Sequence, residues 1–321
     1  MERSGMTLGF LTAFLTITLL LCNMNFAFAA GEEGGSLEGK KGRVLVGEIE
    51  VITLSDGVSQ RATLQQAQLL QGDKDKIATR LEETYPSGQM EATVNAFLIN
   101  TGSKLVLVDT GNGVKGKPLM GHVVDNLRAA GYQPEEIDEI YLTHMHPDHI
   151  GGLSSDGQRV FSNATLYVDK NEADYWLNAS NLTTASETQK RTFQAVKEML
   201  TPYLTAGKFN IFDGNTQLTP GISAKELFGH TPGHVAYVVE SKGETLILWG
   251  DVIHVAAVQF ENPAVTIAYD SDQENAAKVR QKILREAAKN NTLVGGAHLA
   301  FPGIGHVTSD GEEGFKFVPI D

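Results

Sequence analysis

The stretch Thr143-His144-Met145-His146-Pro147-Asp148-His149 decides the fold of this 321-residue sequence. It completes a short apolar run that begins at Ile137 and is expected to form a buried strand. His144 and His146 stand two residues apart, so the period of a strand aims both imidazoles to the same side. Imidazole and carboxylate are the ligands that suit zinc and its neighbours. The stretch therefore predicts a metal site rather than a solvated polar loop.

Further ligands are expected elsewhere in the chain, because four local ligands cannot complete two metal shells. Thr231-Pro232-Gly233-His234 places a histidine on a turn between strand-like runs. Trp249-Gly250-Asp251 and Gly295-Gly296-Ala297-His298 each place a ligand just after an apolar run. All three lie at strand ends, where a sheet can present side chains to a shared rim.

The pattern His-x-His-x-Asp-His, followed in order by a His, an Asp and a His, resembles the metallo-β-lactamase fold superfamily from Val44 onward. Within it, the motifs at 229–234 and 297–306 resemble those of the exported group that contains methyl parathion hydrolase and several lactonases. The resemblance implies an α/β protein built as a four-layer αβ/βα sandwich, with metals at the edge between two sheets.

Carried over position by position, the resemblance also implies two metal-binding groups and two catalytic carboxylates, Asp148 and Asp251. The expected ligands are His144, His146 and His234 for one ion, Asp148, His149 and His298 for the other, and Asp251 between them, with a bridging hydroxide. Two such ions lower the pKa of a shared water enough to give hydroxide at neutral pH. Zinc is the expected metal, and manganese, iron and cobalt are alternatives.

Asp109 lies in Asp109-Thr110-Gly111, which resembles the first motif of the superfamily. Its carboxylate is expected to support a metal ligand through the ligand's other ring nitrogen. The alternative is a plain turn cap. The four histidines outside the ligand pattern are expected to be structural or supporting: His122, His230, His254 and His306.

Trp176 and Phe193 lie at places that resemble the aromatic lining of the leaving-group pocket in methyl parathion hydrolase. Aromatic side chains at helical spacing usually belong to the core. Both roles, pocket and core, stay open. The loop after Asp109-Thr110-Gly111 has no counterpart of another pocket aromatic, which disfavours efficient hydrolysis of aryl phosphotriesters.

The chain is expected to begin with an export signal at residues 1–29, because an apolar run ends shortly before Ala27-Phe28-Ala29. A membrane anchor is the alternative. A flexible segment at 30–42 and a single hydrolase domain at 43–321 follow, and the expected location is the periplasm or the medium. Cys22, the one cysteine, falls inside the signal, so no disulfide or thiol chemistry is expected in the mature protein.

The pattern of apolar residues predicts sheets covered by helices. Residues 92–99 and 104–109 are expected to form a hairpin, and residues 122–130, 172–204 and 271–289 are expected to be helical.

The net charge of −13 disfavours nucleic acid and favours a small neutral substrate. The leading hypothesis is hydrolysis of a lactone, an aryl ester or a phosphotriester. The alternatives are a thioester hydrolase like glyoxalase II, a β-lactamase, and a metal-binding scaffold without turnover. No membrane contact is expected after signal cleavage, and the sequence leaves open whether the protein is a homodimer.

Overall fold

The computed structural model describes residues 1–2 and 42–320. Apart from Met1 and Glu2, the expected export signal lies outside the described residues. Over the described ranges, no helix combines the length and the apolar character needed to cross a bilayer.

The first of two seven-stranded sheets carries the residues that precede the His-rich stretch. Its strands, in spatial order, are β1 (Arg43–Val46), β2 (Ile49–Ala62), β4 (Gln89–Asn100), β5 (Leu105–Val108), β6 (Glu139–Tyr141), β9 (Thr165–Asp169) and β10 (Phe209–Phe212). The pairs from β1 to β5 are antiparallel, and those from β5 to β10 are parallel. The antiparallel pair β4 and β5 confirms the predicted hairpin.

The second sheet is formed by later residues and is mostly antiparallel. Its strands, in spatial order, are β11 (Gln217–Thr219), β12 (Ile222–Glu226), β13 (Val235–Ser241), β14 (Glu244–Leu248), β16 (Leu293–Gly295), β17 (Ile304–Asp310) and β18 (Gly314–Pro319). Only β14 and β16 pair in parallel. Two small ribbons join β3 (Leu70–Gln71) to β15 (Thr266–Ile267) and β7 (Ser154–Ser155) to β8 (Gln158–Arg159).

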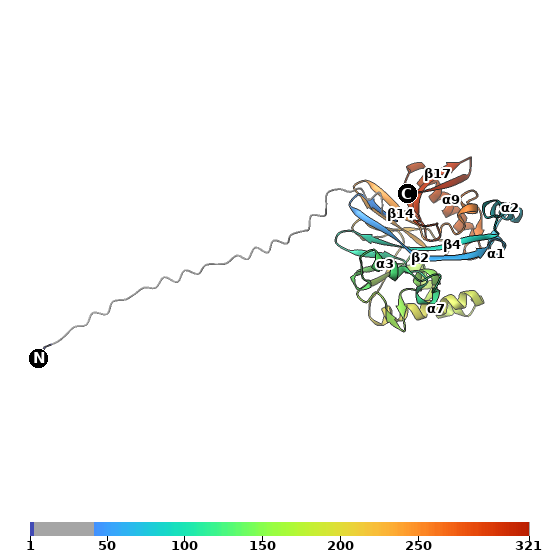
Figure 1. Ribbon diagram of the computed structural model, residues 1–321. Coiled ribbons are helices and arrows are strands. Elements are labelled where there is room, and N and C mark those ends of the chain that lie inside the picture. Colours follow the sequence, from blue (N-terminus) through green and yellow to red (C-terminus); the bar gives the residue numbers. More distant parts are fainter. Residues whose placement is uncertain (3–41, 321) are drawn as a thin grey trace. The chain divides into compact units, whose positions relative to one another are not determined.

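Helices pack outside the two sheets and against the small ribbon of β3 and β15. They are α1 (Thr63–Leu69), α2 (Lys74–Thr84), α3 (Val123–Ala129), α4 (Pro147–Ile150), α5 (Lys170–Trp176), α6 (Ala179–Leu182), α7 (Glu187–Thr205), α8 (Ala256–Gln259) and α9 (Gln273–Asn290). Figure 1 shows α3 and α7 on one side of β2 and β4, and α9 on the other side. The four-layer sandwich expected from the sequence is confirmed.

Successive side chains along a strand pack into different apolar layers. Phe97 and Ile99 of β4 point into a core that lies between the two sheets, together with side chains such as Tyr237 of β13. Ala96 and Leu98, one residue out of phase, pack beneath the helices of the first sheet. Both faces of β4 are therefore buried, as the period of two requires for a strand between two apolar layers.

Local signals explain where the long helices begin and end. The predicted helical stretch 172–204 is three helices, and α7 begins at a capping box in which Ser186 and Gln189 satisfy each other's backbone N–H groups. The predicted helix 271–289 is α9, which is capped by Asp272 and ends at Asn291 in the left-handed conformation.

Candidate metal centre

Ends of strands from both sheets bring the candidate ligands together. The loop after β6 carries His144 and His146, and Pro147 starts the short helix α4 that presents Asp148 and His149. In the second sheet, His230 follows β12, Asp251 follows β14 and His298 follows β16. The site therefore lies where loops of the two sheets meet.

Three groups of side chains have ligand atoms within 4.8 Å of one another, and two of these groups share no residue. The first is His144, His146, His230 and Asp251, and the second is Asp148, His149 and His298. Asp251 faces members of both groups, since its Oδ1 lies 3.1 Å from Nε2 of His149 and its Oδ2 lies 3.4 Å from Nε2 of His230. A carboxylate in this position can bridge two ions.

Unpartnered buried atoms show that these residues fit metal ions. Neither Nε2 of His149 nor Oδ1 of Asp251 has a hydrogen-bond partner, although both are buried. Nδ1 of His149 lies 2.8 Å from Oδ2 of Asp109, so the ring proton goes to Asp109 and the Nε2 lone pair faces the Asp251 oxygen. Two lone pairs at this separation repel each other unless a metal ion or a proton lies between them.

The charges of the cluster also favour a bound cation. Burial lowers the pKa of His149, but the carboxylates of Asp251 and Asp109 outweigh it and hold this pKa well above its ordinary value. Burial and the neighbouring His230 lower the pKa of His146 to about 3, so this imidazole is neutral and able to bind a metal. The buried carboxylates are therefore stabilised by nearby positive charge, but neutral imidazoles such as that of His146 do not supply it. A bound cation would supply it.

The structure corrects the expected role of His234. Its Nε2 accepts a hydrogen bond from the backbone N–H of Asp251 at 3.1 Å, and its Nδ1 lies 3.1 Å from the carbonyl oxygen of Leu227. With both ring nitrogens engaged, His234 has no atom left for a metal. His230, expected from the sequence to be structural or supporting, occupies the cluster in its place.

The sequence offered no local signal to separate these two histidines, because both belong to the same motif, Gly229-His230-Thr231-Pro232-Gly233-His234. The distinguishing partner of His230 is Asp270, whose Oδ1 lies 2.8 Å from His230 Nδ1 and which follows forty residues later.

Asp109 lies where it can hold the metal loop in place. Its Oδ1 accepts from the backbone N–H of Thr143 at 2.8 Å, and its Oδ2 accepts from the Thr143 hydroxyl at 2.7 Å in addition to the His149 ring. Its backbone is in the left-handed region, with φ of 59°. These contacts orient His149 rather than cap a turn.

Glu172, which the sequence reading missed, joins the two histidine loops. Its buried carboxylate accepts from the backbone N–H of Met145 at 2.8 Å, between His144 and His146. It also accepts from the Thr231 hydroxyl at 2.6 Å and from the N–H of Gly233 at 3.0 Å, both inside the motif that carries His230 and His234. Burial raises the pKa of Glu172. Glutamate on a helix is common, so no pattern marked this one.

Trp176 and Phe193 belong to the core outside the first sheet, with exposed fractions of 5% and 7%. The Trp176 indole N–H donates to Glu172 at 2.8 Å, and its ring lies 6.0 Å from that of His146. The two aromatic rings pack edge to face, 4.8 Å apart. Of the two roles left open by the sequence, the structure supports the core, with Trp176 placed behind a ligand.

His254, which the sequence predicts to be structural or supporting, lies beside the second group and forms the third group with Asp251 and His298. Its Nε2 is 3.1 Å from Oδ2 of Asp251, its Nδ1 has no hydrogen-bond partner, and its ring stacks on that of His298 at 5.2 Å. The two other histidines outside the pattern, His122 and His306, are absent from the groups described above.

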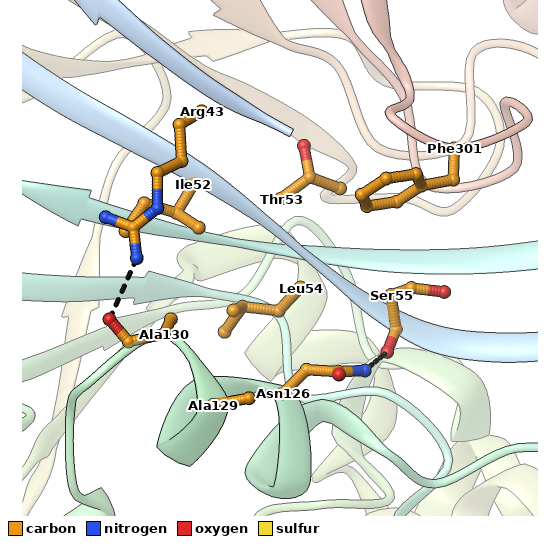
Figure 2. A pocket seen from close by; sticks show the side chains of 9 residues that line it. All are labelled: Arg43, Ile52, Thr53, Leu54, Ser55, Asn126, Ala129, Ala130 and Phe301. Atoms are coloured by element: carbon orange, nitrogen blue, oxygen red, sulfur yellow. Dashed lines mark hydrogen bonds between the residues drawn. The ribbon is translucent and has the colours of Figure 1, made fainter. Parts of the chain in front are cut away.

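The cavity in Figure 2 is separate from the cluster. It measures about 560 Å³ and lies between β2, α3 and the loop that carries Phe301. Arg43 spans one side of it and donates to the carbonyl oxygen of Ala130 at 2.8 Å. None of its lining residues is a candidate ligand.

Several known proteins are similar to this chain. An N-acyl homoserine lactonase of Bacillus sp is 25% identical over 222 residues, which are 63% of this chain and 80% of the relative. A crystal structure of hydrolase AbOPH in the beta lactamase superfamily is 33% identical with a TM-score of 0.81, covering 88% of this chain and 97% of that one. AidC, a dizinc quorum-quenching lactonase solved with a product, is 28% identical with a TM-score of 0.78, covering 87% and 97%.

The family model for the metallo-beta-lactamase superfamily matches residues 91–298, a span that contains all four ligand-bearing regions of the cluster. The two seven-stranded sheets, the helices outside them and the His/Asp cluster at their shared edge agree with that match. This chain belongs to the metallo-beta-lactamase superfamily.

Proposed function

We propose that the protein is a two-zinc lactonase that opens the ring of N-acyl homoserine lactones. The observation that carries the proposal is the pair of ligand groups around Asp251, with unpartnered buried atoms facing each other at 3.1 Å. Several of the similar proteins are named as N-acyl homoserine lactonases, and one similar solved structure is named as a dizinc lactonase, whereas another relative is named as a thioesterase.

Each group would hold one ion. His144, His146 and His230 would bind the first, Asp148, His149 and His298 the second, and Asp251 would contact both. Two bound divalent ions would activate water and polarise the scissile carbonyl oxygen. The remaining polar residues keep the ligands oriented: Asp109 fixes the ring of His149, and Glu172 holds the two histidine loops against each other.

A neutral substrate suits the charge of the molecule. With a net charge of −13, the protein repels anionic ligands at long range, whereas an uncharged lactone meets no such barrier. Aryl esters and phosphotriesters are also uncharged and present an oxygen that metal ions polarise, so the same experiment has to compare them with lactones.

The test is a substrate panel assayed with zinc-loaded protein. It contains N-acyl homoserine lactones of several chain lengths, aryl esters, phosphotriesters and thioesters. We expect the largest kcat/KM on a lactone. A largest value on a thioester or a phosphotriester would refute the lactonase assignment while leaving the metal centre intact.

Matched histidine variants link activity to the cluster. We expect His149→Ala to lower kcat/KM more than about 100-fold, the upper range for loss of a contact that merely supports a ligand. His306→Ala, a half-buried histidine on β17 outside the cluster, should keep parental rates. Equal rates for His149→Ala and the parent would contradict the assignment.

Metal analysis tests the identity of the ions separately. We expect two equivalents of zinc in the purified protein, since imidazole and carboxylate ligands suit it. Bound iron with consumption of oxygen would overturn the hydrolase proposal.

We also propose that the protein is exported, as the apolar run before Ala27-Phe28-Ala29 suggests. N-terminal sequencing of protein recovered from the periplasm of an expression host should find a new terminus near residue 30. An intact N-terminus on membrane-bound protein would support the anchor instead.

A further inference from the structure

A buried ion pair connects helix α9 to the metal cluster. Asp270 lies between β15 and α9, and its side chain is fully buried. Its Oδ1 is 2.8 Å from Nδ1 of His230, while its Oδ2 accepts from the backbone N–H of Ile267 at 3.1 Å and lies 3.6 Å from Nη2 of Arg280. A carboxylate that takes the Nδ1 proton leaves Nε2 of His230 free to bind a metal.

Arg280 reaches a second ligand loop with the same guanidinium group. Its Nε donates to the carbonyl oxygen of Val252 at 2.6 Å, one residue after Asp251. Its Nη1 donates to the carbonyl oxygens of Pro263 and Val265 at 3.1 Å and 2.8 Å. One cation therefore contacts both the residue next to Asp251 and the carboxylate that holds His230.

The cost of this arrangement indicates that it does more than fill the core. Arg280 is only 1% exposed, and the face of α9 around it is otherwise apolar, with Ala276, Ile283 and Leu284 also buried. Removing a charge from water is unfavourable, and a buried ion pair is often no more stabilising than apolar residues of similar volume. Packing alone gives no reason for a charge at this position.

We propose that Asp270 and Arg280 are positioning residues that set the affinity of the ion held by His144, His146 and His230. Asp270 fixes the proton of His230 on Nδ1 and makes Nε2 a better donor. Arg280 holds Asp270 and the backbone beside Asp251 in one arrangement, so that ligands from two separate loops keep their spacing. This inference rests on the proposed two-metal function.

The test measures zinc binding to the full-length protein and does not depend on the substrate. Competition with a chromophoric chelator gives two dissociation constants, and mass spectrometry of metals after gel filtration gives the stoichiometry. The variants are Asp270→Ala, Asp270→Asn, Arg280→Met, Arg280→Lys and the double variant that combines Asp270→Asn with Arg280→Met. Circular dichroism and urea unfolding of the EDTA-treated proteins report on folding separately.

Arg43→Met is the matched control. Arg43 also pairs with a carboxylate, Glu50 at 2.9 Å, and donates to a backbone carbonyl, yet it contacts no candidate ligand. Its loss should lower stability and leave both zinc constants unchanged.

We expect Asp270→Ala to raise one zinc dissociation constant about 10- to 100-fold and to change the other much less, the range seen when a supporting carboxylate is lost. Asp270→Asn keeps the shape and removes the charge, so it should weaken the same ion by a smaller factor. Arg280→Met should weaken that ion too, and Arg280→Lys should recover part of the loss. The effects of Asp270→Asn and Arg280→Met should be less than additive, because they act on one contact network.

The proposal is overturned if folded Asp270→Asn and Arg280→Met proteins bind both ions with parental constants. It is also overturned if both ions weaken equally and in step with the loss of stability, as a purely structural role requires. If Asp270→Ala does not fold, the Asn and Lys variants decide the result. A parent that binds two ions and opens no lactone refutes the proposed function alone, whereas a parent that binds none refutes the metal centre.

Discussion

Replacing Glu172 with alanine should lower the free energy of unfolding by about 4 kcal/mol or more. The carboxylate accepts four hydrogen bonds in a buried position: from the N–H groups of Met145 and Gly233, the Thr231 hydroxyl and the Trp176 indole. Each buried donor left without an acceptor costs roughly 1–3 kcal/mol. Four donors at the low end of that range give the expected loss.

Two further variants test whether the hydrogen bonds cause the effect. Glu172→Gln keeps one acceptor oxygen but turns an amide N–H₂ toward some of the donors, so it should lose about 2 kcal/mol. Thr231→Val removes a single donor and leaves Glu172 with three partners, so it should lose only about 1 kcal/mol.

Urea unfolding of EDTA-treated protein, followed by circular dichroism, measures these losses without a contribution from bound metal. A loss below about 1 kcal/mol for the alanine variant would refute the reasoning. So would a glutamine variant as unstable as the alanine variant, because that result would assign the effect to charge alone.

Three other predictions follow from the cluster and its loops. His230→Gln should leave one zinc equivalent by metal analysis, whereas His234→Gln should keep two and unfold at lower urea concentration. Loss of an ion from both variants would contradict the distinction between them. Gly250→Ala should destabilise more than Gly243→Ala in urea unfolding: both glycines have positive φ, but an added Cβ at Gly250 would lie 2.7 Å from Nε2 of His234, whereas Gly243 has open space. Equal losses would show that only the backbone conformation matters. Without metal, stability should fall as the pH rises through the window from about 6.5 to about 9. Burial lowers the pKa of His230, but Asp251 and Asp270 raise it to about 9 in the folded protein. The proton that stabilises the folded state is therefore fully bound below the pKa of His230 in the unfolded state, and it is lost as the pH rises through the pKa of the folded state. Thermal melts of EDTA-treated protein check this, and zinc should remove the dependence; a flat metal-free profile would be inconsistent with it.

The sequence was sufficient for the fold and for the local part of the site. The stretch from His144 to His149 is contiguous, so spacing alone shows that its ligands converge. Asp251 and His298 could be found because each follows an apolar strand, and strand ends of one sheet share a rim. Two β-rich runs joined by the turn residues at 100–103 likewise predicted the hairpin of β4 and β5.

Contacts between distant residues decided what the sequence could not. His230 and His234 have the same neighbours in the chain, and only Asp270 and the Asp251 backbone separate their roles. Glu172 is recognisable only once two loops surround it. Such long-range hydrogen bonds leave no periodic trace in the sequence.

The candidate metal ligands lie in two parts of the chain. Residues 144–149 follow a strand of the first sheet, and the ligands between residues 230 and 298 follow strands of the second sheet. Neither half of the sandwich carries the full set of ligands for the two metal ions. During folding, the centre can therefore form only after the two sheets have docked, and metal uptake becomes a direct readout of that docking. A chain whose sheets separate must release its ions, so in this molecule the final assembly of the fold and the onset of catalytic competence are one event.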